Sequence, residues 1–204
     1  MDDARPPADA VRVTGAARYG GVAIFLHWTI AAAIFCTFPL GVYMADLPPA
    51  PHRLELVAYH RWIGITVLAL ACARLAWRIT HPPPTLPVAV PAWQRRVAAV
   101  AHWVLYALIV AIPLSGWAHS SAAGEPTVYL GLWTLPDPVA RDEALAGTLK
   151  RVHQGLNFAL LALVIVHVSA AIKHQFVDRD GLIGRMLPGG AHFGSSGSGG
   201  SERR

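Results

Sequence analysis

Charge and cysteine are both scarce in this sequence. Charged residues make up 14% of its 204 residues and hydrophobic residues 54%, whereas a typical soluble domain is about one quarter charged. This composition excludes an ordinary soluble globular domain. It favours a protein embedded in a lipid bilayer, and the chain is long enough for one compact bundle.

The two cysteines, Cys36 and Cys72, are isolated, and the sequence contains no C-x-x-C-H motif. Covalent c-type haem attachment is therefore not expected, and no disulfide is expected between thiols that lie toward opposite membrane faces. The net charge of +5 does not indicate a nucleic-acid partner, because the basic residues gather at the ends of the apolar segments.

Four segments are long and apolar enough to cross a bilayer, which requires about 20 mainly apolar residues. They cover about residues 20–44, 57–77, 97–119 and 151–173. The connectors are rich in turn-forming residues, and a proline cluster at 82–84 must lie outside the lipid. We predict an all-α transmembrane four-helix bundle (19–188), up-down-up-down, between an N-terminal tail (1–18) and a low-complexity C-terminal tail (189–204).

Lysine and arginine are distributed unequally between the two sides of this bundle. Twelve lie at the N-terminus, around the second connector and on the C-terminal side, whereas five lie around the first and third connectors. Because basic residues remain on the cytoplasmic side, both termini are predicted to be cytoplasmic.

Four histidines lie at two depths within the predicted spans. His27 lies about 10 Å from the inner boundary, and His167 is near the inner end of the fourth span. His60 and His153 lie toward the outer ends of the second and fourth spans. The 14 residues between His153 and His167 fall about 40° short of four helical turns, so both rings point to one sector, about 21 Å apart.

Histidine pairs at two depths suit two flat cofactors stacked across the membrane. Imidazole is a strong ligand of haem iron, and a bundle interior offers an apolar slot. We therefore predict two haem b groups, with His27 and His167 on the inner iron and His60 and His153 on the outer iron. Small residues near these ligands are suited either to admit a macrocycle or to pack helices: Gly64, Gly155, Ala170 and Ala171.

Two alternative roles for the histidines stay open. A single intramembrane histidine often serves only as a hydrogen-bonding residue, and several can line a metal-transport path. The spans contain no Asp or Glu, which hard-cation and proton-driven carriers usually require. In the third span, His102 and His119 lie about 100° apart around the helix, so this span is not expected to hold both cofactors. His102 is a candidate contact for a haem propionate or a quinone, or a simple interfacial residue.

Five motifs, taken together, resemble the bacterial cytochrome b561 family. They are RYGGVAIFLHW, AYHRWIGITVLALACARLAWR, the connector THPPPTLP, AHWVLYALIVAIPLSGW, and LKRVHQGLNFALLALVIVHVSAAIKHQF. The similarity extends from about Arg18 to Pro188. It implies a multi-pass di-haem b cytochrome of the bacterial inner membrane, and it carries the axial-ligand pattern over to His27, His60, His153 and His167.

One branch of this family resembles a superoxide oxidase, and the short length and compact connectors of this chain are similar to that branch. The resemblance implies an oxidoreductase that passes electrons from superoxide, or another periplasmic donor, to membrane ubiquinone. Related four-helix b subunits serve hydrogenases and formate dehydrogenases. An electron-transfer subunit that links such a dehydrogenase partner to the quinone pool is therefore the alternative.

The candidate substrate sites lie near the two ends of the bundle. Superoxide is an anion, and a positive patch near its electron acceptor raises the encounter rate. Arg61 adjoins His60, while Lys150 and Arg151 precede His153, where they would equally mark the boundary of a span. The second connector is nearly free of lysine, although family members can be lysine-rich there. The candidate quinone residues are therefore Trp93, Arg95, Arg96 and His102.

Overall fold

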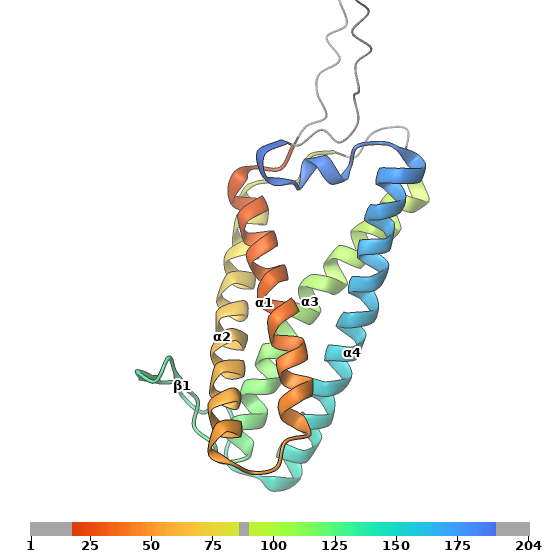
Figure 1. Cartoon of the computed structure of the whole chain (residues 1–204). Coiled ribbons are helices and arrows are strands. Elements are labelled where there is room, and N and C mark those ends of the chain that lie inside the picture. The colour runs from red at the N-terminus through yellow and green to blue at the C-terminus, as the bar shows by residue number, and fades with distance from the viewer. Residues whose placement is uncertain (1–17, 86–89, 191–204) are drawn as a thin grey trace, which may run out of the picture.

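The described part of the chain is mainly helical. The computed structural model describes residues 18–85 and 90–190, which contain four long helices running up and down in sequence order (Figure 1). These are α1, Gly21–Ala45; α2, Pro51–Thr80; α3, Ala92–Ala122; and α4, Glu143–Lys173. The predicted all-α four-helix bundle is confirmed, while the two predicted tails lie almost wholly outside the described residues.

All four helices are long and apolar enough to cross a membrane. Large apolar side chains point outward along them: Phe35 is 80% exposed, Phe158 63% and Val166 61%. A soluble monomer rarely exposes so much apolar surface, whereas a membrane protein presents it to lipid. These side chains therefore mark the lipid-facing surface.

Three helices begin before the apolar segments that the sequence defines. α2 begins at Pro51, α3 at Ala92 and α4 at Glu143, against predicted starts near residues 57, 97 and 151. Pro51 suits a first turn because its missing N–H needs no partner there. The Asp142 side chain caps α4 by accepting from the Leu145 N–H at 3.0 Å. Hydropathy locates the lipid-embedded part of a helix, and these polar starts project beyond it.

Helices that follow one another in the chain pack together: α1 on α2, α2 on α3 and α3 on α4. The buried core lies at mid-height between the two histidine depths. Its central residue on α4, Leu160, is seven residues from both His153 and His167, about 10 Å along the helix from each. The other members of this core are Ile30, Ala71, Tyr106, Ile109 and Ile112.

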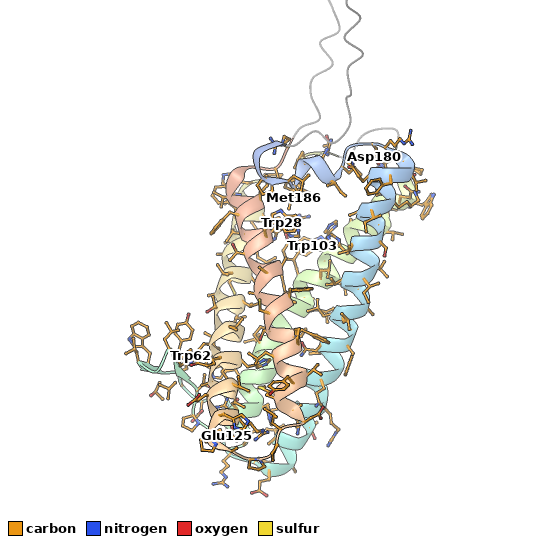
Figure 2. The ribbon with its side chains drawn as sticks, viewed as in Figure 1. Trp28, Trp62, Trp103, Glu125, Asp180 and Met186 are labelled. Atoms are coloured by element: carbon orange, nitrogen blue, oxygen red, sulfur yellow. The ribbon has the colours of Figure 1, made fainter. Side chains whose placement is uncertain are left out.

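The segment after α4 crosses the end of the bundle at which α1 begins (Figure 1). It contains a π-helical turn, η1 (His174–Asp178), and two 3-10 turns, η2 (Ile183–Arg185) and η3 (Pro188–Gly190). The Trp28 indole N–H donates to the Met186 carbonyl at 2.7 Å, and Arg18 donates to the Leu187 carbonyl at 2.8 Å (Figure 2). These bonds fasten the segment to α1 and its N-terminal flank.

The connector between α3 and α4 carries a small antiparallel hairpin. Its strands are β1 (Val128–Tyr129) and β2 (Trp133–Thr134). The Trp62 indole N–H of α2 donates to the Val128 carbonyl at 2.7 Å, and Glu125 forms an ion pair with Arg61 (Figure 2). The connector is therefore anchored on α2 next to one of the candidate histidines.

The orientation of the bundle stays a prediction, which reporter fusions test. Because twelve of the 17 basic residues lie on the side of the termini, green fluorescent protein fused to the C-terminus should fluoresce, and alkaline phosphatase fused there should be inactive. The same reporters inserted at Gly131, between β1 and β2, should give the opposite pattern. Active phosphatase at the C-terminus would contradict a cytoplasmic location.

Candidate cofactor site

Two histidine pairs lie inside the bundle. The ring centroids of His60 (α2) and His153 (α4) are 6.2 Å apart, with the rings inclined at 80°. Those of His27 (α1) and His167 (α4) are 6.4 Å apart, inclined at 69°. The structure thus brings the four histidines together in the pairs that depth along the spans predicts.

The two outer histidines are oriented by neighbouring helices. Nδ1 of His153 lies 2.9 Å from the carbonyl oxygen of Ile112, and a carbonyl can only accept, so this nitrogen carries the proton. The Ser115 hydroxyl lies 3.2 Å from the same nitrogen, and the Thr37 hydroxyl lies 3.1 Å from Nδ1 of His60. Protonation at Nδ1 leaves Nε2 of His153 available as a metal ligand.

A glycine of a neighbouring helix makes room for each outer histidine. A Cβ atom at Gly41 of α1 would lie 3.0 Å from Cε1 of His60, and one at Gly116 of α3 would lie 3.0 Å from Cε1 of His153. Contacts this short force the neighbour to move. Any side chain at these two positions would therefore displace the imidazole that packs against it.

Key residues recur on each helix at an interval of 14 residues. The pairs are His27 and Gly41 on α1, His60 and Arg74 on α2, His102 and Gly116 on α3, and His153 and His167 on α4. Since 14 residues are close to four turns, each pair shares a face and is separated by about 21 Å. We name the two levels by the membrane side that each faces in the predicted orientation. The inner layer is His27, Arg74, His102 and His167, and the outer layer is Gly41, His60, Gly116 and His153.

The inner layer contains a third histidine. His102 lies with its ring centroid 5.3 Å from that of His167, and its Nδ1 lies 2.6 Å from the carbonyl of Ala98 in its own helix. The sequence places His102 at a depth close to that of His27, and the structure adds that it borders the pair. Its separation from His167 is about 1 Å shorter than that between His27 and His167.

The spacing within the pairs fits a metal ion between the rings. A metal such as zinc lies about 2 Å from an imidazole nitrogen, which is itself about 1 Å from its ring centroid, so two rings on opposite sides of one ion lie about 6 Å apart. The observed 6.2 Å and 6.4 Å agree with this arrangement. The residues present therefore fit the two bis-histidine haem sites that the sequence predicts.

The surroundings of the outer pair also suit a large apolar cofactor. A cavity between His60 and His153 is lined mainly by apolar side chains, and Gly64 faces open space. This apolar lining and the open space beside Gly64 suit the macrocycle of a haem.

The three candidate cations near the outer layer differ in their surroundings. Arg61 forms an ion pair with Glu125, which offsets its charge. Lys150 and Arg151 are exposed on α4, within one turn of His153, and within residues 18–85 and 90–190 no carboxylate pairs with either. The charges of Lys150 and Arg151 are therefore less compensated than that of Arg61.

The four candidate quinone residues are not all brought together. Trp93, Arg95 and Arg96 lie in the first turns of α3, where Trp93 is 65% exposed, whereas His102 lies beside His167. A separate cavity of about 530 Å³ opens at the same end of the bundle. This cavity is a second candidate for the quinone site, because its lining combines the cation of Arg18 with aromatic rings. The residues that line it are Arg18, Tyr19, Gly21, Ile24, Phe25, Trp28, Thr29, Pro188 and Gly189.

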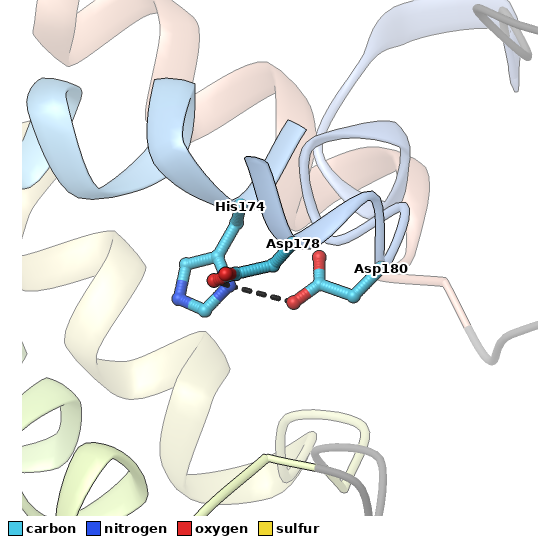
Figure 3. Close-up of side chains that lie close together, drawn as sticks. All are labelled: His174, Asp178 and Asp180. Carbon is cyan, nitrogen blue, oxygen red and sulfur yellow. Dashed lines mark hydrogen bonds and ion pairs between the residues drawn. The ribbon is translucent and has the colours of Figure 1, made fainter. Parts of the chain in front are cut away.

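Another group of potential metal ligands lies where α4 ends (Figure 3). Nδ1 of His174 lies 2.6 Å from Asp180 and 3.1 Å from Asp178, and Lys173 also pairs with Asp178. These side chains satisfy one another across the π-helical turn. The group therefore forms an ion-pair network that ends the helix.

Known proteins similar to this chain are bacterial cytochrome b561 homologues and a probable superoxide oxidase. The family model described as prokaryotic cytochrome b561 matches residues 18–189. "Cytochrome b561 homolog 2" of Escherichia coli (strain K12) is 33% identical over 174 residues, covering 83% of this chain and 91% of that protein. "Probable superoxide oxidase CybB" of Yersinia pestis is 27% identical over 172 residues, covering 84% of this chain and 96% of that protein.

The two outer-layer glycines provide a test of the site. Gly41→Ala and Gly116→Ala should each displace a histidine ring and reduce the haem content of the purified protein, measured as its Soret absorbance relative to protein. Gly20→Ala is the control, because Gly20 is exposed just before α1 and a Cβ there meets nothing within 4 Å, and it should retain full haem content. Equal haem content in all three variants would show that the glycines do not position the histidines.

Proposed function

The chain belongs to the prokaryotic cytochrome b561 family, and we propose that it binds two haem b groups, oxidises superoxide and reduces ubiquinone. Family membership establishes a membrane electron-transfer protein and implies haem b. The number of haems, their ligands and the two substrates form the proposal. The observation that carries it is the presence of two histidine pairs at two depths of one bundle.

The two layers would hold the two cofactors. In the proposal, His60 and His153 bind the outer iron, and His27 and His167 bind the inner iron. Haem b supplies an iron centre that takes up and releases one electron at a time. The Ile112 carbonyl keeps the proton of His153 on Nδ1, which would leave Nε2 free to bind the iron.

The apolar core between the layers separates the two sites. Ile109, Leu160 and their neighbours fill the bundle at mid-height and exclude water from the space between the histidine pairs. A low-dielectric environment also influences the reduction potential of each centre. The bundle would therefore hold two redox centres at different depths, between which an electron could pass across the membrane.

The outer end carries the proposed superoxide site. Lys150 and Arg151 are exposed near His153, and no carboxylate of the described residues pairs with either, so an approaching anion would meet two uncompensated cations there. The relative named "Probable superoxide oxidase CybB" supports this choice of donor. In the balanced reaction, two superoxide anions become two O₂, and one ubiquinone takes up the two electrons and two protons to become ubiquinol.

The inner end carries the proposed quinone site. A quinone is an apolar molecule with two carbonyl oxygens, so it needs an apolar entrance and one or two hydrogen-bond donors. The proposed contacts lie at two heights along α3: Trp93, Arg95 and Arg96 in its first turns, and His102 about two turns further along, in the inner layer. Ubiquinone from the bacterial inner membrane would therefore be reduced near the cytoplasmic side of the bundle.

Rapid mixing of superoxide with the oxidised protein tests this function. Absorbance of reduced haem should rise faster than superoxide dismutates spontaneously, and added ubiquinone should become ubiquinol. The double variant Lys150→Gln/Arg151→Gln should lower the second-order rate about tenfold at low salt, because it removes the electrostatic attraction of the anion.

Arg179→Gln is the control for that double variant. Arg179 is an exposed cation at the opposite end of the bundle, so its removal leaves the charges around the outer site unchanged. It should react at the wild-type rate. Wild-type protein whose haem is reduced no faster than superoxide dismutates would rule out superoxide as the donor and favour the electron-transfer subunit of a dehydrogenase.

A further inference from the structure

The inner layer contains a cation but no acid. Arg74 of α2 follows His60 by 14 residues, the interval that separates His153 from His167 on α4. Within residues 18–85 and 90–190, no carboxylate forms an ion pair with Arg74 or with Arg78, one turn further on. A guanidinium held among apolar helices is costly without a counter-charge. The Tyr106 ring, whose centroid lies 5.8 Å from Arg74 Cζ, partly offsets this cost, and a bound anionic group would supply the full counter-charge.

Arg74 points into the bundle rather than toward lipid headgroups. Its Nε–H donates to the Tyr106 hydroxyl at 3.1 Å, and its Nη1 donates to the Ala23 carbonyl at 2.9 Å. Tyr106 lies one turn after His102 on α3, and Ala23 lies one turn before His27 on α1. The guanidinium is thus held between α1 and α3, one turn from His27 on α1 and from His102 on α3.

These two hydrogen bonds leave much of the guanidinium unused. A guanidinium has five N–H donors in a planar fork, and two of them are occupied. The Nη2 group has no acceptor among the residues that the structure describes. A planar fork with free donors matches the two oxygens of a carboxylate. The geometry therefore selects a carboxylate rather than a point anion.

We propose that Arg74 binds a propionate carboxylate of the inner haem, and that the positive charge of Arg74 raises the reduction potential of that haem. The inference rests on the proposed function, which places a haem between His27 and His167. Haem b carries two propionate carboxylates, so it supplies the class of group that the inner layer lacks. A positive charge beside the haem favours its reduced form, because reduction adds an electron.

A brace between helices is the competing role for Arg74, since its two hydrogen bonds join α2 to α1 and α3. Tyr106→Phe separates the two roles. It removes the hydrogen bond from the Arg74 Nε–H but leaves the positive charge and the free Nη2 group in place. A brace is weakened by both Tyr106→Phe and Arg74→Gln, whereas the proposed counter-charge is lost only in Arg74→Gln.

The experiment is a redox titration of the purified, haem-loaded full chain. In Arg74→Gln, the ratio of reduced to oxidised inner haem at a fixed potential should fall about tenfold, equivalent to about 59 mV for one electron. The outer haem should titrate as in the wild type. Tyr106→Phe should leave both haems unchanged, as should Arg179→Gln, which removes an exposed cation at the same end.

An unchanged inner haem in Arg74→Gln, or an equal shift in Tyr106→Phe, would overturn the proposal. If Arg74→Gln does not accumulate, Arg74→Lys keeps the charge but loses the planar fork. The propionate bending band in its resonance Raman spectrum should then move from the wild-type position, and an unmoved band would also overturn the proposal. Wild-type protein that purifies without haem would instead refute the proposed function itself.

Discussion

The arrangement of this bundle depends on one constraint, the interval of 14 residues between key positions on every helix. Fourteen residues are nearly four helical turns, so one face of each helix contributes to two levels about 21 Å apart. α4 supplies a histidine to both levels, while the other helices each supply a histidine to one level and a glycine or arginine to the other. The inner and outer layers therefore differ in composition, although the same four helices supply both.

The inner and outer layers differ in how their buried polar groups are stabilised. In the outer layer, His153 donates to a backbone carbonyl, and the two glycines leave space for the rings. An unmet buried donor costs about 1–3 kcal/mol, so the Ile112 carbonyl both stabilises and orients the ring. In the inner layer, Arg74 is tied to Tyr106 and the α1 backbone. The layers are therefore unequal in charge, which would allow the two proposed haems to differ in reduction potential.

The fold and the histidine pairs follow from local patterns in the sequence. Long apolar segments define the helices, and the interval between His153 and His167 is visible on one helix alone. The support of each ring comes from other helices: Gly41 reaches His60 from α1, and Gly116 reaches His153 from α3. No local pattern signals such contacts, although the same interval counted from His27 and His102 leads to both glycines. The pairing of Arg61 with Glu125, 64 residues away, likewise depends on how the α3–α4 connector folds back.

The central claim is that each layer holds its own haem between two histidines. The most direct test is the ratio of haem to protein, measured by the pyridine haemochrome assay on purified wild-type protein and on His153→Ala. The account predicts about two haems per chain in the wild type and about one in His153→Ala, because only the outer site loses a ligand. A wild-type ratio of one, or the loss of both haems in a His153→Ala protein that still folds, would contradict two independent sites.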